Sequence, residues 1–272
     1  MCWLVWFVLA ATDATASPAP TVDLPEGVVL VAHRGVTDSG QRENSLAAFE
    51  AAIARGYTHV EADIQSTQDG HPVCLHDRSL KWTTDIDQNV DALTLKELRA
   101  LVPETRVPTF ETVCARAAGR IGLMLDIKGC PADLRGAFIK RLETSLRRHG
   151  LLESALFIGR DDVGRAFQGK ALIAWGAPLE QAKRSRLWNQ QPGEKFFMFG
   201  HAGDFSREDI EAFQAHGLKV IVSINKFHYL GKGDLVTLGM ADVRRMLDYG
   251  VDGLQIDSVY DRSFRHKTSD AQ

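Results

Sequence analysis

Short apolar runs alternate with helix-like segments along most of this chain, and this alternation constrains its fold more than any other feature. Such runs, apolar on successive positions, are typical of strands buried on both faces of a parallel sheet. Eight of them are predicted to be strands, at residues 28–32, 59–64, 122–127, 156–159, 171–175, 196–199, 220–224 and 253–256.

Segments with helix-start signals lie between these runs. The predicted starts are Asn44 before 45–54, Thr94 with Glu97 as a capping box, Pro131 before a run to 149, Ser206 with Asp209, and the amphipathic stretch 240–249. A strand followed by a helix, eight times, predicts an α/β fold of the (β/α)8 TIM-barrel class. An open doubly wound sheet is the alternative, but no Gly-x-Gly-x-x-Gly motif follows the first strand.

A turn signal after the second predicted strand interrupts this alternation. Asp69-Gly70, between apolar stretches, predicts a hairpin that leads into residues 72–75 and then to His76. Loops that follow the strands of such a barrel gather at its C-terminal face, where active sites form. We therefore expect this hairpin excursion to bring His76 over Glu61 and Asp63.

Length and composition favour one globular domain with short additions at both ends. The 272 residues are 44% hydrophobic and 25% charged, and we expect a barrel domain at 27–260, a linker at 17–26 and a polar tail at 261–272. Residues 1–16 resemble a signal peptide and predict export to the periplasm or beyond. Their apolar stretch is too short for a stable transmembrane anchor. No Lys or Arg precedes it, so a mis-assigned start or a loose membrane tether is the alternative.

Charge and cysteine content argue against two further classes. A net charge of -3, without a stripe of lysine and arginine, argues against nucleic acid as a partner. Removal of residues 1–16 would leave Cys74, Cys114 and Cys130, whose spacing does not suit a zinc site. Cys114 and Cys130 could close a small loop in an oxidising compartment, but we expect packed thiols rather than a disulfide framework.

Two alternating carboxylates give the first chemical signal. Glu61 and Asp63 are two residues apart on a predicted strand, so their side chains point to the same face. Such a pair repels unless a positive charge lies between its members, and Mg²⁺ or Ca²⁺ suits an oxygen-lined site. Asp126 ends the third strand and could complete the ligands. We predict one divalent cation held by Glu61, Asp63 and Asp126, with ion pairing to lysines as the alternative.

Two histidines supply groups that can move protons near neutral pH. His33 ends the first predicted strand, and His76 follows the hairpin. Cleavage of a phosphodiester requires a nucleophile to lose a proton and a leaving group to gain one. We therefore predict that His33 and His76 are the catalytic pair.

Three further residues each have two possible roles. Arg34 is predicted to clamp the phosphate, or else to pair with Glu43 or Asp77. Lys128 is predicted to neutralise a phosphate oxygen, or else to pair with its neighbouring carboxylates. Asn44 is predicted to cap the first helix on local grounds, and it could also reach a catalytic histidine or a phosphate.

Several motifs resemble those of the glycerophosphodiester phosphodiesterase family. They are His33-Arg34-Gly, Glu43-Asn44-Ser45, Glu61-x-Asp63, the Thr-x-Asp-Gly turn, Val73-Cys-Leu-His76-Asp77, Leu93-Thr-x-x-Glu-Leu98, Val107-Pro-Thr-Phe-Glu111, Asp126-Ile-Lys128 and Gly250-Val-Asp-Gly-Leu-Gln-Ile-Asp257. The resemblance implies a metal-dependent TIM-barrel enzyme that releases glycerol 3-phosphate and an alcohol from a glycerophosphodiester. It implies acid/base roles at His33 and His76, metal binding at Glu61 and Asp63, and phosphate contacts from Arg34 and Lys128. The first nucleophile is either water or a substrate hydroxyl.

A few positions depart from that pattern or extend it. The family usually has Glu where this chain has Asp126, and the Asp-x-Lys arrangement resembles sphingomyelinase D-like phospholipases, which keeps a lysophospholipid or sphingolipid substrate open. Trp82 stands where the family commonly has Arg, and could line the alcohol pocket or cover the loop. Trp175 is a candidate contact to the leaving group, with core packing as the alternative. A phosphate-binding barrel without turnover is the alternative of another class, and the pair of histidines argues against it.

Overall fold

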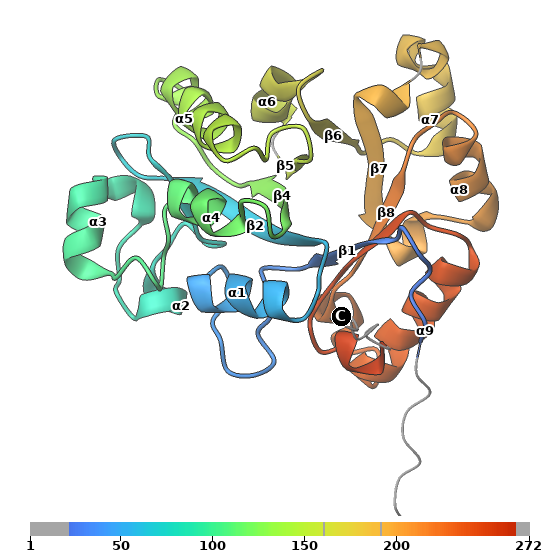
Figure 1. Cartoon of the computed structure of the whole chain (residues 1–272), viewed down its shortest axis with the longest axis horizontal. Coiled ribbons are helices and arrows are strands. Elements are labelled where there is room, and N and C mark those ends of the chain that lie inside the picture. The colour runs from blue at the N-terminus through green and yellow to red at the C-terminus, as the bar shows by residue number, and fades with distance from the viewer. Residues whose placement is uncertain (1–21, 160, 191, 265–272) are drawn as a thin grey trace, which may run out of the picture.

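Eight parallel strands close into a barrel in the computed structural model, which describes residues 22–159, 161–190 and 192–264. The strands run in the order β1-β9-β8-β7-β6-β5-β4-β2, and a β1–β2 pairing closes the ring. Figure 1 shows helices on its outside. The strands are β1 (Val29–Ala32), β2 (His59–Ser66), β4 (Gly122–Ile127), β5 (Leu156–Gly159), β6 (Leu172–Trp175), β7 (Phe196–His201), β8 (Val220–Ile224) and β9 (Gly253–Ile256). The predicted (β/α)8 barrel is confirmed.

The helices largely begin where the capping signals place them. The capping boxes at Thr94 and Ser206 are both formed, since each hydroxyl accepts from the backbone N–H three residues on. The helices are α1 (Leu46–Ala54), α2 (Lys81–Thr84), α3 (Leu95–Leu101), α4 (Phe110–Ala117), α5 (Arg135–Arg148), α6 (Asp161–Gly164), α7 (Leu179–Arg184), α8 (Arg207–Gln214) and α9 (Leu235–Asp248).

Two predicted helices start elsewhere than expected, and one expected helix is replaced by a turn. The run opened by Pro131 begins with a turn, in which Leu134 N–H donates to Pro131 O (3.2 Å), so α5 starts at Arg135. α9 starts at Leu235 rather than at 240, because the Asp234 side chain caps it by accepting from Thr237 N–H (2.8 Å). Glycines near this start hid it in the sequence. After β9 the described chain forms only the short 3₁₀ turn Asp261–Ser263 rather than an eighth α-helix.

Apolar side chains fill two layers, one inside the barrel and one between the strands and the helices. The inner layer includes Val31, Met124, Phe197 and Ile221. A separate small core lies under the excursion between β3 and α4, with Leu80, Val90, Leu98 and Val107 among its buried members. The excursion is therefore a packed unit of its own and not a loose loop.

The predicted hairpin is present. β3 (Pro72–Cys74) pairs antiparallel with β2, with Ile64 opposite Cys74. Gly70 in the turn has φ +75°, a conformation that favours glycine. Two hydrogen bonds then bring the chain back to the barrel: Leu75 N–H donates to Asp63 O (3.0 Å) and Gln65 Nε2 donates to His76 O (2.9 Å).

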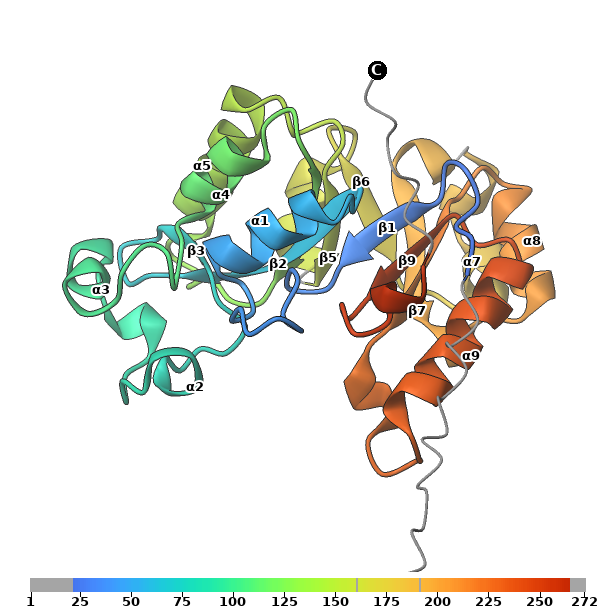
Figure 2. The same cartoon turned by 60° about the horizontal axis from the view of Figure 1, so that its bottom comes forward.

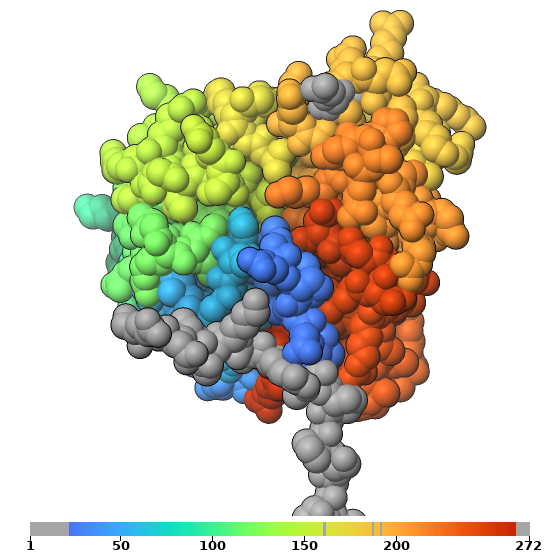
Figure 3. All heavy atoms as spheres, turned by 45° about the vertical axis from the view of Figure 1, so that its right-hand side comes forward, coloured from blue at the N-terminus to red at the C-terminus, as the bar shows by residue number. Residues whose placement is uncertain are grey.

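The described chain begins beside the place where it ends. Val22 N–H donates to Ser263 O (2.7 Å), and Val22 forms a bridge with Phe264; Figure 3 shows this blue start of the chain against the red C-terminal segments. Because Asp261 and Phe264 are buried, packing extends four residues past the boundary expected at 260. The expected signal peptide (1–16) lies outside the described residues.

Two further expectations concern thiols and membrane spans. Cys74, Cys114 and Cys130 are all thiols, so the loop closure considered for Cys114 and Cys130 is not formed. Among the described residues, no helix combines the length and apolarity that crossing a membrane would require.

Asp261 joins the C-terminal segment of the described chain to the residues between α1 and β2. Its buried carboxylate accepts from Arg55 Nη1 (3.0 Å) and Tyr57 Oη (2.8 Å). We expect Asp261→Asn to lower the free energy of unfolding by about 1–3 kcal/mol, because a buried amide cannot replace the carboxylate that accepts from both Arg55 and Tyr57, while Arg55 keeps its second ion pair, with Asp38 (2.7 Å). Urea unfolding followed by circular dichroism measures this. Asp248→Asn, which removes an exposed pair with Arg207, is the control and is expected to cost about 0.5 kcal/mol or less; equal losses would contradict the assignment.

Candidate functional site

The side chains predicted to carry chemistry meet at the C-terminal ends of the barrel strands, where β1, β2, β4 and the hairpin come together. Those brought into this cluster are His33, Arg34, Asn44, Glu61, Asp63, His76, Asp126 and Lys128. Asp257, which follows β9, joins them through a hydrogen bond to His33.

Three carboxylates form the centre of the cluster. In the β2–β4 register, Asp63 lies opposite Asp126, and one carboxylate oxygen from each of Glu61, Asp63 and Asp126 lies within 4.8 Å of the other two. Glu61 and Asp63 are each 1% exposed. Burial, and then repulsion from Asp63 and Asp126, raises the pKa of Glu61 well above its ordinary value.

Two cations compensate Asp63. Arg34 Nε lies 3.3 Å from Asp63 Oδ2, and Lys128 Nζ lies 3.1 Å from Asp63 Oδ1 and 2.6 Å from Asp126 Oδ2. Burial pushes the pKa of Asp63 upward, but the charges of Arg34 and Lys128 outweigh it and leave that pKa below its usual value. The ion pairs considered as alternatives for Lys128 are thus formed, as is the pair of Arg34 with Glu43 (3.1 Å).

Arg34 and Asn44 hold the carboxylates from strained backbone positions. Both have left-handed backbones, with φ of 56° and 55°, which ordinary residues rarely adopt. Arg34 N–H donates to Glu61 Oε2 (2.8 Å). The Asn44 amide donates to Asp63 Oδ2 (2.7 Å) and accepts from Asp63 N–H (2.9 Å). The predicted helix cap at Asn44 was therefore wrong, because the adjacent Ser45 caps α1 and leaves the amide to clamp Asp63.

Two glycines give the cluster the space it occupies. Gly35 has φ +82°, and a Cβ there would meet the backbone of Ala48. Gly159, at the end of β5, has φ +87°, and a Cβ there would collide with the Asp126 carboxylate. Sequence reasoning missed Gly159, and the available signal was a glycine as the last residue of the predicted strand 156–159. In the structure Gly159 pairs with Ile127.

Both histidines are oriented by a carboxylate. His33 Nδ1 lies 2.8 Å from Asp257 Oδ1, and His76 Nδ1 lies 2.9 Å from Asp77 Oδ1. Burial pushes the pKa of Asp257 up, but hydrogen bonding and the charge of His33 outweigh this and hold it below its usual value. An ionised carboxylate only accepts, so Nδ1 of His33 carries the proton and Nε2 is the atom available for proton transfer.

Trp175 is the one predicted site residue that the structure does not bring to the cluster. Alternation along β6 points Ala174 into the barrel and Trp175 outward. The Trp175 ring packs 5.7 Å from Phe196 and 6.5 Å from Trp188, measured between ring centroids.

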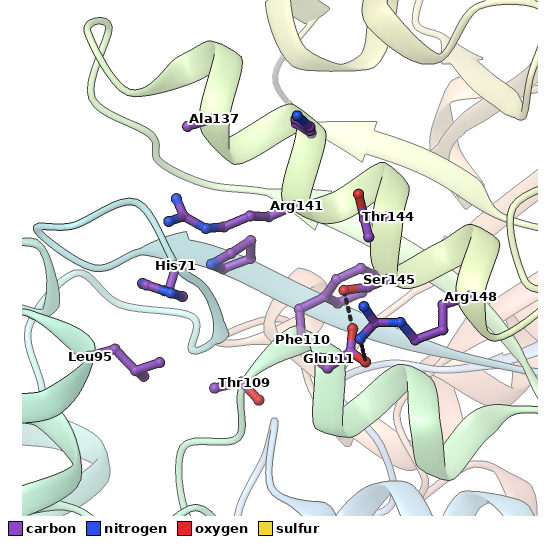
Figure 4. A pocket seen from close by; sticks show the side chains of 12 residues that line it. His71, Leu95, Thr109, Phe110, Glu111, Ala137, Arg141, Thr144, Ser145 and Arg148 are labelled. Carbon is purple, nitrogen blue, oxygen red and sulfur yellow. Dashed lines mark hydrogen bonds and ion pairs between the residues drawn. The ribbon is translucent and has the colours of Figure 1, made fainter.

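A separate cleft lies between the hairpin, α4 and α5 (Figure 4). His71, Arg141 and Arg148 line it, and Glu111 is held there by Ser145 and Arg148. Neither the clustered carboxylates nor His33 and His76 line this cleft.

Residues 33–136 match the model of the glycerophosphoryl diester phosphodiesterase family. Glycerophosphodiester phosphodiesterase 1 of Mus musculus is 35% identical over 131 residues, which are 43% of this chain and 38% of that protein. A putative glycerophosphodiester phosphodiesterase of Bacillus subtilis is 33% identical over 114 residues, 39% of this chain and 46% of that protein. The matched stretch thus spans less than half of these relatives.

Solved structures share the fold over a longer stretch. A glycerophosphoryl diester phosphodiesterase from Parabacteroides distasonis superposes with a TM-score of 0.70 at 20% identity, covering 88% of this chain and 87% of that one. A phosphodiesterase from Oleispira antarctica, solved in complex with the product sn-glycerol-3-phosphate, gives 0.65 at 22% identity, covering 86% and 95%. At these identities the likeness establishes the barrel.

The raised pKa of Glu61 predicts an unusual dependence of stability on pH. Between the ordinary pKa and the raised one, the unfolded chain has released a proton that the folded protein retains, so stability falls as pH rises through this interval. In EDTA we expect Glu61→Gln to stabilise the protein by about 1–3 kcal/mol near pH 8, and to have little effect near pH 4. Urea unfolding at both pH values measures this.

Glu50→Gln is the matched control. Glu50 is a surface carboxylate paired with Arg120 (2.8 Å), and its pKa is lowered by that hydrogen bond. Its variant is expected to show no gain at high pH. A Glu61→Gln protein that is no more stable than the wild type near pH 8 would show that Glu61 is not strained by burial.

Proposed function

We propose that this chain is a member of the glycerophosphodiester phosphodiesterase family, whose model matches residues 33–136, and that it is a metal-dependent hydrolase that cleaves glycerophosphodiesters to glycerol 3-phosphate and an alcohol. The observation that carries this proposal is the buried carboxylate cluster flanked by two histidines whose Nδ1 atoms are each held by an aspartate. The product named for the Oleispira antarctica structure supports the same cleavage.

The carboxylate cluster fits a hard divalent cation, Mg²⁺ or Ca²⁺. Its ligand atoms are all carboxylate oxygens, which these ions prefer. Asp63 Oδ1 is buried without a well-oriented hydrogen bond, and Glu61 is strained by repulsion, so a cation would satisfy both. Bound by Glu61, Asp63 and Asp126, it would polarise a phosphoryl oxygen and stabilise the charge that develops there.

The remaining groups bind the phosphate and move protons. Arg34 and Lys128 form ion pairs with the clustered carboxylates. Once a cation bound these carboxylates, the two basic side chains would be free to pair with the oxygens of an incoming phosphate. His33 and His76 would exchange protons through Nε2, one with the nucleophile and one with the leaving oxygen. Asn44 is a positioning residue, because both ends of its amide are committed to Asp63.

The two histidines distinguish an enzyme from a binding barrel. Phosphate binding does not require two imidazoles with a fixed tautomer, whereas diester cleavage requires two proton transfers. We expect His33→Ala and His76→Ala each to lower kcat on glycerophosphocholine at least about 100-fold. Release of glycerol 3-phosphate, in a coupled assay with Mg²⁺ or Ca²⁺, measures this.

His71→Ala is the matched control, since His71 also pairs with an aspartate, Asp69 (3.3 Å), but lines the separate cleft. It is expected to keep wild-type activity. The proposed function fails if folded, metal-loaded protein turns over no glycerophosphodiester or lysophospholipid, or if the His71 variant loses as much as the other two.

Metal removal gives a second, independent test. We expect EDTA to abolish turnover and Mg²⁺ or Ca²⁺ to restore it. Asp126→Asn removes one charge from the ligands and is expected to weaken cation binding at least about tenfold. Titration calorimetry of the metal-free protein measures the affinity. Unchanged affinity in this variant would exclude Asp126 as a ligand.

A further inference from the structure

Large apolar side chains that remain exposed are concentrated around the mouth of the barrel. Among the described residues they are Trp82 (74% exposed), Leu230 (65%), Phe227 (49%), Leu101 (46%) and Val236 (40%). Trp82 lies on α2, Phe227 and Leu230 lie on the segment between β8 and α9, and Val236 lies in the first turn of α9. The segment after β8 begins at the C-terminal strand ends, the face that carries the carboxylate cluster. Figure 2 shows α2 and the β8–α9 segment projecting to the same side of the barrel, with the strand ends between them.

The segment between β8 and α9 forms one wall of this mouth. Tyr229 anchors it, because its ring is buried and its hydroxyl donates to Asp242 (2.7 Å). With Tyr229 turned inward, Phe227 and Leu230 on either side of it are turned to solvent. The Phe227 ring lies 6.2 Å from the ring of His33, measured between centroids, so this wall is continuous with the catalytic cluster.

α2 forms the opposite wall in the same way. Leu80 is fully buried in the small core of the excursion, and Trp82, two residues on, is the most exposed of the large apolar side chains. Arg42 Nη1 donates to Trp82 O (3.4 Å), which ties α2 to the loop that carries Glu43 and Asn44. The sequence left open whether Trp82 lines the alcohol pocket or covers the loop, and at 74% exposure its ring does neither.

Exposed lysines accompany the apolar side chains on both walls. Lys81 precedes Trp82, and Lys226 and Lys232 flank Phe227 and Leu230. Tryptophan and aliphatic side chains bordered by lysine are the composition with which proteins contact the headgroup region of a lipid surface, where the rings enter the interface and the amines meet phosphates. Isolated exposed apolar residues are ordinary, but two anchored walls around one catalytic mouth are not.

We propose that Trp82 on one wall and Phe227, Leu230 and Val236 on the other form a lipid-contact rim that seats the barrel mouth on a lipid surface. The diester would then be taken from an amphiphile, whose acyl chain rests against the rim while its phosphate enters the cluster. The choice of substrate rests on the proposed function, whereas the surface contact does not. Hydrolysis adds water across the P–O bond to the headgroup alcohol, whose oxygen gains the proton.

Two measurements test the rim. The first is co-sedimentation of the protein with phosphatidylcholine vesicles, with and without phosphatidylglycerol, for the wild type and for the double variant Trp82→Ser, Leu230→Ser. The second is choline release from lysophosphatidylcholine and from glycerophosphocholine, which share the headgroup and the diester and differ in the acyl chain. Leu101→Ser is the matched control, since Leu101 is an exposed leucine on α3, outside the rim.

We expect the wild type and Leu101→Ser to sediment with vesicles, and the double variant to bind at least about tenfold more weakly. The double variant should lose about the same factor in kcat/KM on aggregated lysophosphatidylcholine and keep its rate on glycerophosphocholine. Absence of wild-type sedimentation, equal losses in the Leu101 variant, or a concentration-dependent dimer that the double variant abolishes would each overturn the proposal. Vesicle binding without turnover of either substrate would support the rim and refute the proposed function instead.

Discussion

The burial of two carboxylates within a few ångströms of each other is the constraint on which this site depends. Glu61 and Asp63 are removed from water on the inward face of β2, whose other face packs in the layer between the strands and the helices, and the pairing of β2 with β4 brings Asp126 to the same level. An uncompensated arrangement of this kind would cost several kcal/mol per charge. Hydrogen bonds and ion pairs from Arg34 and Asn44 offset part of that cost, and both residues adopt left-handed backbone conformations to make them.

The compensation is incomplete, and that incompleteness is what makes the cluster suited to chemistry. Asp63 has Arg34, Lys128 and Asn44 as partners, whereas Glu61 receives one backbone N–H and retains a strongly raised pKa. A cation and a phosphate dianion or diester that arrive together would exchange ion pairs with the cluster and leave its net charge little changed. Binding energy and folding energy would then be linked, as they are where a metal site is assembled by folding.

Much of this architecture follows from local sequence, because strands and caps are decided by neighbouring residues. The run at 122–127 is apolar enough to be a buried strand wherever it lies, and Thr94 with Glu97 closes a capping box without help from the rest of the chain. The partners of the site are not local. His33 and Asp257 are 224 residues apart, and Asn44, in the loop between β1 and α1, is diverted from its expected cap by the Asp63 carboxylate on β2. Such choices are settled by tertiary packing, which no short window contains.

Tertiary packing also decides the direction in which an apolar side chain points. Trp175 and Trp82 are equally prominent in the sequence, and both were candidates for the alcohol side of the site. Strand alternation turns Trp175 into the outer core, while the burial of Leu80 turns Trp82 to solvent. Exposing an indole costs hydrophobic stabilisation that an inward rotation would recover. This fold instead holds Trp82 outward beside the buried Leu80, and it holds Phe227 and Leu230 outward beside the buried Tyr229 across the mouth. The exposed apolar surface thus lies where a diester with an acyl chain would have to enter.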